Sequence, residues 1–215
     1  MALDTRKFLA PGVLVSWCLS MIYWIGYFFF HIFRFIWFPC RIIGKENIPK
    51  TGACIFASNH NSNLDPFLIG IVPKREVYFF AKKELFKNPV IGWLMREWHA
   101  FPADRSRADI GALKTAIRYL KNGHPLVFFP EGTRGGNQNK GKAFPGVGFL
   151  ANKAGVPVVP VYIDGSEKCM PPGSKFPKRH WITVTFGNPM FFSESVSYEE
   201  ISHSVMQRIL ELRSV

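Results

Sequence analysis

The chain has 215 residues, a formal net charge of +12 and a pI near 9.7. This length accommodates one domain with its own core plus an extension, and the charge indicates an anionic partner such as nucleic acid, anionic lipid or a phosphorylated substrate. The four cysteines show no Cys-x-x-Cys spacing, which argues against a disulfide scaffold or a cysteine zinc site and favours a reducing compartment.

The N-terminal part is apolar. Residues 13–33 contain no charged side chain, and this run is close to the roughly 20 residues that a helix needs to cross a bilayer. Trp17, Tyr23, Trp24 and Tyr27 lie in it, and such amphipathic aromatics favour the membrane–water boundary. No small-residue cleavage site follows the run, which argues against a signal peptide. A buried hairpin is the alternative, but so many adjacent aromatics are hard to enclose.

We therefore predict that residues 1–41 form a helical segment that anchors the chain in a membrane. Spanning of the bilayer and shallow insertion as two short helices both fit the sequence. Residues 42–215 form the second predicted unit, a globular domain that begins with a linker or an edge strand at 41–49.

Strands and helices alternate in the globular domain. Short runs rich in Val, Ile and Phe predict strands at 54–58, 77–80, 126–129, 156–163 and 181–186. Helices are predicted from a cap at Ser106 to Gly123, with Ile110, Leu113, Ile117 and Leu120 on one apolar stripe, at 144–154, and after a capping box at Ser197 and Glu200. This alternation predicts an α/β fold with a mixed, largely parallel sheet flanked by helices.

His60 and Asp65 are the first candidates for chemistry. They stand between a predicted strand and a predicted helix, and they can meet only if His60 lies in the turn and Asp65 near the helix start. In that geometry Asp65 orients the ring through Nδ1, and Nε2 acts as a general base. A helix N-cap at Asp65 before Pro66 and a surface histidine at 60 are the structural alternatives.

Other polar residues follow neighbouring strand ends, where ligands bind in open α/β sheets. Gly132 permits close backbone approach, Thr133 carries a hydroxyl, and Arg134 presents a planar fork for phosphate. Lys82 and Arg105 add cations, and Glu131 is compatible with an arginine partner. Solvated surface charge is the alternative for each. No third ligand accompanies His60 and Asp65 at a recognisable spacing, so no metal site is predicted.

These residues resemble the glycerolipid acyltransferase family, and in particular the 1-acylglycerol-3-phosphate (lysophosphatidate) acyltransferases. Its four motifs are similar to Asn59-His60-x4-Asp65, Phe101–Arg105, Phe129–Arg134 and Val156–Pro160, in the same order. The stretch from Ala81 to Leu85 also resembles the family. Two positions depart from the pattern: His99 stands where relatives often have glycine, and Phe144-Pro145-Gly146 lacks a lysine that many relatives carry after a phenylalanine.

The resemblance implies an O-acyltransferase that moves a fatty acyl group from a thioester to the free hydroxyl of 1-acylglycerol 3-phosphate. His60 oriented by Asp65 would be the base, and no acyl-enzyme intermediate would form. It also implies acceptor binding by Arg105, Glu131, Gly132, Thr133 and Arg134, with a contribution from Lys82. The donor would be acyl-CoA or an acyl-carrier protein, and no cofactor is expected.

Other functions remain to be distinguished. Glycerol 3-phosphate or another lysolipid is an alternative acceptor, and a non-catalytic basic lipid-binding membrane protein is an alternative class. No nucleic-acid partner is expected, because the basic residues are dispersed and the aromatics concentrate in the apolar leader. We expect membrane localisation at an anionic surface, with the active site on the cytoplasmic face.

Overall fold

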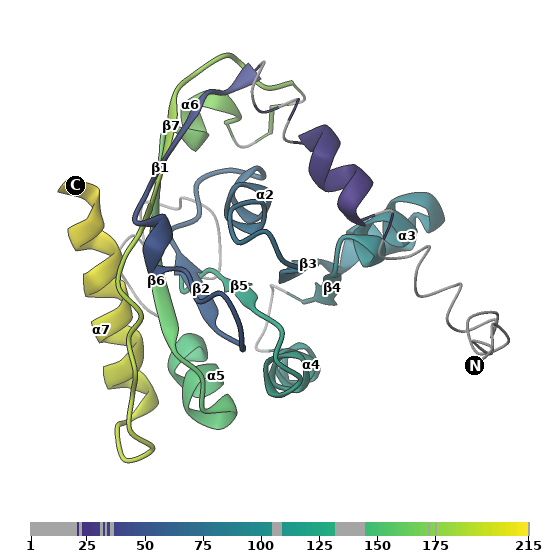
Figure 1. Cartoon of the computed structure of the whole chain (residues 1–215). Coiled ribbons are helices and arrows are strands. Elements are labelled where there is room, and N and C mark those ends of the chain that lie inside the picture. Colours follow the sequence, from purple (N-terminus) through teal and green to yellow (C-terminus); the bar gives the residue numbers. More distant parts are fainter. Residues whose placement is uncertain are drawn as a thin grey trace, which may run out of the picture.

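A seven-stranded sheet forms the centre of the computed structural model, which describes residues 21, 23–30, 32, 34, 37–104, 109–131, 145–171, 173–174 and 176–214 (Figure 1). The strands are β1 (Cys40–Ile43), β2 (Ile55–Ser58), β3 (Tyr78–Lys82), β4 (Ala100–Ala103), β5 (Leu126–Phe128), β6 (Val158–Asp164) and β7 (Ile182–Phe186). Their order is β1-β7-β6-β2-β5-β3-β4, and only the β6–β7 pair among them is antiparallel. Strands β2 to β6 therefore end at one edge of the sheet, which we term the carboxyl edge.

Helices cover both faces of the sheet. They are α2 (Asp65–Gly70), α3 (Pro89–Glu97), α4 (Ile110–Lys121), α5 (Gly146–Ala154), α6 (Ser166–Cys169) and α7 (Tyr198–Glu211), with 3-10 turns at Lys45–Asn47, Lys83–Lys87 and Leu212–Ser214. Alternate strand residues divide between two cores, because successive side chains of a strand point to opposite faces. Phe56 packs on the α2 side, whereas Ile55 and Ala57 pack with α4, α5 and α7. The predicted α/β architecture with a largely parallel sheet is confirmed.

Most predicted elements occur within a few residues of the expected positions. Helix α5 ends at Gly155 in the left-handed conformation (φ 65°), and the capping box of Ser197 and Glu200 opens α7. The strand option for residues 41–49 is also correct, because β1 is an edge strand paired with β7. Phe38 is fully buried just before β1, so residues preceding position 42 contribute to the core.

The expected start of α4 was wrong. The helix begins at Ile110, and Asp109 caps it by accepting a hydrogen bond from the backbone N–H of Ala112 (3.0 Å). Ser106 lies outside the described residues. The buried stripe of α4 consists of Ala112, Ala116 and Leu120, whereas Ile110 is exposed. The small alanine side chains allow α4 to lie close to the sheet. The spacing of large apolar residues had instead predicted a buried stripe that included Ile110.

Strand β4 and helix α3 were not predicted. β4 has only four residues and contains Pro102, which an edge strand tolerates because one side of it forms no ladder hydrogen bonds. Helix α3 has large apolar residues on its exposed side, so its pattern resembles neither a buried strand nor a helix packed along one face. Asn88 caps it by accepting from the N–H groups of Val90 and Ile91, both at 3.0 Å.

The helical residues between Met21 and Trp37, which we term the N-terminal helix, pack against α2 and α3 (purple in Figure 1). Tyr27 donates a hydrogen bond to the carbonyl of Ile71 (2.9 Å), and Tyr23 donates to the carbonyl of Arg75 (3.3 Å). Residues 1–20 of the predicted membrane segment lie outside the described residues. Among the residues that the structure describes, no helix is both long enough and apolar enough to cross a bilayer.

The departure noted at His99 has a structural counterpart. His99 adopts φ 58°, in the left-handed region that glycine occupies without strain. Its ring stacks on Tyr78, with centroids 4.6 Å apart, and contacts Tyr23 of the N-terminal helix at 4.8 Å. The histidine thus keeps the backbone conformation that suits glycine and adds a contact to the N-terminal helix.

Candidate active site

The turn after β2 brings His60 and Asp65 together at the carboxyl edge. His60 Nδ1 lies 3.0 Å from Asp65 Oδ2, and both side chains are buried. Asp65 is the first residue of α2, but it forms no side-chain cap on that helix. Its Oδ2 instead accepts hydrogen bonds from the backbone N–H groups of Asn61 and Ser62, both at 2.7 Å. The N-cap alternative for Asp65 is therefore wrong, and so is the surface alternative for His60.

This contact assigns the two ring nitrogens of His60. A carboxylate acceptor requires Nδ1 to carry hydrogen, so Nε2 is the basic nitrogen of the neutral ring. Phe129, directly after β5, stacks on the imidazole with centroids 4.0 Å apart and planes 19° apart. The stack and the Asp65 contact together restrict rotation of the ring. The arrangement can accept a proton at Nε2 and stabilise the resulting imidazolium.

Two polar side chains fasten the turn to the rest of the fold. Asn59 Nδ2 donates to the carbonyl of Ile163 on β6, and Asn59 Oδ1 accepts from the Ile163 N–H, each at 2.8 Å. Ser62 Oγ donates to the carbonyl of Met170 after α6 at 2.8 Å. Because Asn59 and Ser62 flank His60, the backbone that carries the imidazole is held on both sides. The positioning role of Ser62 was not predicted, although its place between His60 and Asp65 was a signal.

The other predicted site residues lie at or beyond the same edge, as far as the structure describes them. Lys82 ends β3 and is exposed, and Glu131 follows β5 and is buried. Arg105, Gly132, Thr133 and Arg134 lie outside the described residues. The structure therefore places His60, Asp65 and the ends of β3 and β5 at the same edge of the sheet.

An ion pair at this edge was not predicted. Lys83 Nζ lies 2.6 Å from Asp104 Oδ2, which joins the end of β3 to the residue after β4. Asp109 Oδ2 accepts a hydrogen bond from the Asp104 N–H at 2.9 Å while its Oδ1 caps α4. Asp109 thus ties the two described ends of the 104–109 segment together.

Across the described part of the chain, no group of three or more His, Cys, Asp or Glu side chains is arranged to hold a metal ion. Cys54 lies just before β2, and burial raises the pKa of its thiol to about 12. That pKa disfavours the thiolate, so Cys54 is a poor nucleophile.

Comparison with known proteins finds similar sequences. A family model described as acyltransferase matches residues 39–164. The 1-acyl-sn-glycerol-3-phosphate acyltransferase BAT2, chloroplastic, of Brassica napus is 35% identical over 158 residues, which cover 72% of this chain and 46% of that protein. The 1-acyl-sn-glycerol-3-phosphate acyltransferase of Bacillus subtilis is 29% identical over 181 residues, covering 81% of this chain and 88% of that one.

A solved structure is similar over nearly the whole chain. The crystal structure of the 1-acyl-sn-glycerophosphate (LPA) acyltransferase PlsC from Thermotoga maritima matches with a TM-score of 0.66 and 28% identity, covering 98% of this chain and 86% of that one. The chain spans less than half the length of the first plant relatives that it matches. The family model nevertheless covers more than half of this chain, which confirms the resemblance drawn from the four motifs: the protein belongs to the acyltransferase family.

Proposed function

We propose that the protein transfers a fatty acyl group from an acyl thioester to the free hydroxyl of 1-acylglycerol 3-phosphate, which yields phosphatidate. The observation that carries the proposal is the buried contact between His60 and Asp65 at the carboxyl edge. Binding alone needs no general base, so this pair favours an enzyme over a lipid-binding protein. The names of the similar proteins support a lysophosphatidate acceptor.

In the proposed reaction, His60 Nε2 removes the proton of the acceptor hydroxyl as its oxygen attacks the thioester carbonyl carbon. The negative charge of Asp65 stabilises the imidazolium that forms. The tetrahedral intermediate collapses with cleavage of the carbon–sulfur bond, and the imidazolium returns its proton to the departing thiolate. The products are an ester and a free thiol. No acyl-enzyme intermediate is involved, because the nucleophile is the acceptor's own oxygen.

The acceptor phosphate and glycerol would bind to groups at the carboxyl edge. Lys82 at the end of β3 and Arg105 and Arg134 in the adjoining segments supply cations, and arginine forms paired hydrogen bonds with phosphate oxygens. Glu131, Gly132 and Thr133 complete the proposed acceptor site. The donor is acyl-CoA or an acyl-carrier protein, and the reaction needs no further cofactor.

The enzyme would act at a membrane, since the product and the acceptor are lipids. The proposed attachment uses the N-terminal segment, residues 1–41, whose described part exposes Met21, Phe28 and Phe29. The net charge of +12 favours an anionic membrane surface. The cytoplasmic leaflet carries such a surface, so the proposed site faces the cytoplasm. Residues 42–215 supply the acyltransferase domain.

A donor and acceptor panel tests the proposal. The purified protein is incubated with lysophosphatidate, other lysolipids or glycerol 3-phosphate, each with acyl-CoA or acyl-carrier protein, and products are identified by mass spectrometry. We expect phosphatidate from lysophosphatidate, and loss of that product in His60→Ala with membrane association retained. Preference for another acceptor would replace the substrate assignment, and near-normal turnover in His60→Ala would refute the base.

A further inference from the structure

We propose that helix α3 and the turn before it form a second membrane-contact surface, and that this surface binds a bilayer of anionic lipid. The α3 surface consists of Leu85, Lys87, Val90, Ile91, Trp93 and Arg96. The inference rests on the proposed function for its lipid acceptor and for attachment of the N-terminal segment. It adds a contact within the globular domain itself.

The outer face of α3 is apolar. The exposed fraction is 69% for Val90, 49% for Trp93 and 42% for Ile91. The inner face is held against the preceding turn at Gly92, where an added Cβ would lie 3.0 Å from backbone atoms of Phe86. The helix therefore cannot rotate to bury its apolar side chains without losing this close approach. Large apolar side chains gathered on one exposed face mark an interaction surface.

Charge favours an anionic occupant. Exposed charged side chains between Lys82 and Glu97 are the cations Lys82, Lys83, Lys87 and Arg96 and the single carboxylate of Glu84. Lys83 is paired with Asp104, so Lys82, Lys87 and Arg96 still outnumber Glu84. Arg96 lies three positions from Trp93, which itself lies three from Val90, so the cation and the apolar side chains share a stripe. Tryptophan with neighbouring cations fits the headgroup region of an anionic bilayer. An acidic soluble protein would account for the cations, but it would not account for the exposure of Val90 and Trp93, whereas a bilayer accounts for both.

The α3 surface adjoins the exposed apolar side of the N-terminal helix. Gly26 packs against the indole of Trp98, the residue directly after α3. Figure 1 shows the N-terminal helix (purple) beside α3, at the opposite side of the molecule from α7. Met21, Ile25 and Phe28 on the N-terminal helix are exposed as well. Two neighbouring elements thus expose apolar side chains on one side of the molecule.

The residue after α3 contacts the helix that begins at Asp65. Trp98 contacts Phe67 of α2 with ring centroids 5.3 Å apart, and Phe67 is two residues beyond Asp65. The turn before α3 follows Lys82 directly. A bilayer bound at α3 would therefore lie near the carboxyl edge, where an amphipathic acceptor could reach His60 with its acyl chain still in lipid.

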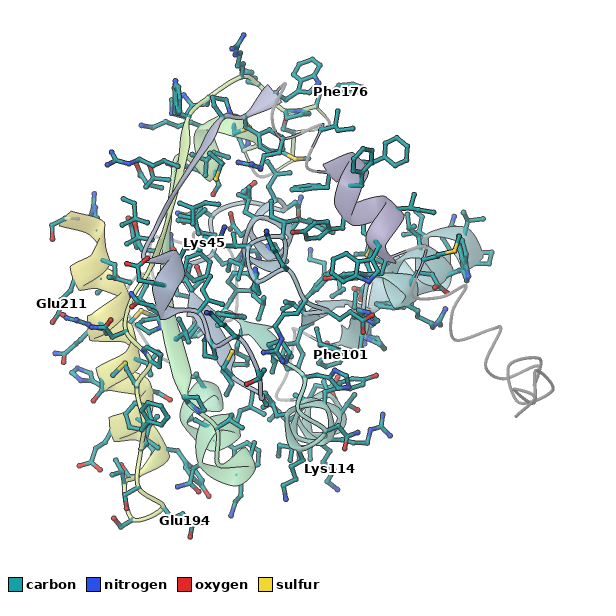
Figure 2. The ribbon with its side chains drawn as sticks, in the orientation of Figure 1. Lys45, Phe101, Lys114, Phe176, Glu194 and Glu211 are labelled. Atoms are coloured by element: carbon teal, nitrogen blue, oxygen red, sulfur yellow. The ribbon has the colours of Figure 1, made fainter. Side chains whose placement is uncertain are left out.

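Vesicle binding by the full chain tests the proposal. Sedimentation is measured with phosphatidylcholine vesicles and with vesicles that also contain phosphatidylglycerol. We expect Val90→Asn/Trp93→Asn to weaken binding to both vesicles by about tenfold, because less apolar area is buried. Lys87→Gln/Arg96→Gln should weaken binding only to the anionic vesicles, by roughly fivefold for each cation. Phe191→Asn is the matched control: Phe191 is 78% exposed, follows β7 and stands three residues before Glu194 in the sequence. Figure 2 labels Glu194 at the lower left, whereas α3 lies at the right in the same orientation in Figure 1.

Two further measurements keep the outcomes distinct. Trp93→Phe should bind vesicles normally but show less quenching by brominated lipid than the parent, because the tryptophans of the N-terminal segment are still quenched while that of Trp93 is gone. The difference reports insertion of Trp93 even if the asparagine variant fails to fold. Activity on a short-chain, water-soluble lysophosphatidate should be equal in parent and α3 variants. Unchanged vesicle binding in both α3 variants would overturn the proposal.

Other results would assign the surface differently. A change in sedimentation coefficient without a change in vesicle binding would assign it to a second copy of the chain. A loss confined to acyl-carrier protein as donor would assign it to that acidic protein, and either result overturns the membrane assignment. Absence of acyl transfer in the parent, with α3-dependent vesicle binding intact, would refute the proposed function and leave the membrane surface standing.

Discussion

Asn59 pairs through its side-chain amide with both backbone polar groups of Ile163, at 2.8 Å for each hydrogen bond. The amide continues the hydrogen bonding of β2 with β6 beyond the last register pair, Ser58 and Val161. Both partners are buried, so no bulk solvent replaces the amide when it is removed. The position of the residue before His60 is therefore set by β6, a strand about 100 residues later in the chain.

Asn59→Ala should lower both stability and turnover. Two buried backbone groups of Ile163 would lose their partner, which costs about 1–3 kcal/mol in the free energy of unfolding. Turnover should fall further than the folded fraction does, because the His60 backbone is released. Denaturant unfolding and kcat measure the two effects. Asn61→Ala is the matched control, since it removes an amide from the same turn but keeps the backbone N–H that contacts Asp65.

Asp65→Asn should reduce kcat by about 100-fold or more while leaving the KM for the acceptor near its parental value. The amide oxygen can still accept from Asn61 and Ser62, but an amide cannot stabilise the imidazolium of His60 by charge. Steady-state kinetics on folded variant, checked by circular dichroism, measure the effect. A kcat equal to that of the parent would contradict the proposed role.

Asp109 has two roles that substitutions can separate. Asp109→Ala should cost about 1 kcal/mol, because α4 loses its cap. Asp109→Ser should retain most of that stability, since serine also accepts from the Ala112 N–H, but it leaves the Asp104 N–H without the Asp109 carboxylate. We therefore expect Asp109→Ser to raise the acceptor KM with little thermal destabilisation. Equal KM values in Asp109→Ser and the parent would show that the cap alone matters.

Acid should weaken the Asp109 contribution. Hydrogen bonds from the Asp104 and Ala112 N–H groups hold the pKa of Asp109 below its ordinary value of 3.8. Because the folded pKa is the lower one, this stabilisation is present above about pH 3.8 and is lost as the pH falls through the folded pKa. Asp109→Ser should remove this component from a plot of unfolding free energy against pH. An unchanged plot would refute the linkage.

His99 should make the fold less stable below about pH 6.5. Burial lowers the pKa of His99 from its ordinary value of 6.5, and the Glu76 carboxylate opposes this only in part. Between the folded and unfolded pKa values of His99, the unfolded chain binds a proton that the native protein does not. The free energy of unfolding therefore decreases as the pH is lowered through that window. His99→Asn tolerates φ > 0 and does not titrate, so it should flatten the dependence there. The same slope in variant and parent would assign the effect elsewhere.

Cys54 and Cys169 should resist thiol reagents in the native protein. Both are fully buried, and burial raises the pKa of Cys54 to about 12 and that of Cys169 to about 11. Labelling at pH 8, located by peptide mass spectrometry, should be slow without denaturant and fast in urea. If native Cys54 were labelled as fast as in urea, the chain just before β2 would have to open to solvent. Cys40, which is only partly buried, serves as the internal comparison.

Structural features that depend on contacts between nearby residues were predictable from the sequence. The capping box of Ser197 and Glu200 and the glycine end of α5 use contacts within four residues, so local sequence is sufficient to specify them. Strand β4 and helix α3 were not predicted because their stability depends on partners elsewhere in the chain. Among the described residues β4 pairs with β3 alone, and α3 packs closely against the turn at Phe86. Ser106 was predicted as the cap of α4, whereas in the fold Asp109 caps this helix.

For the candidate site, the residue types of the His60 turn and its place after a buried strand are written in the sequence, and they predict a base oriented by an acid. The contact at 3.0 Å, the stack on Phe129 and the anchoring by Asn59 to Ile163 depend on tertiary structure. Their physical reason is the parallel sheet, which brings the ends of β2, β5 and β6 to one edge although the strands are far apart in the chain. The residue types needed for acid–base chemistry are therefore visible in the local sequence, whereas the geometry of the site is determined by the pairing of strands that are far apart in the chain.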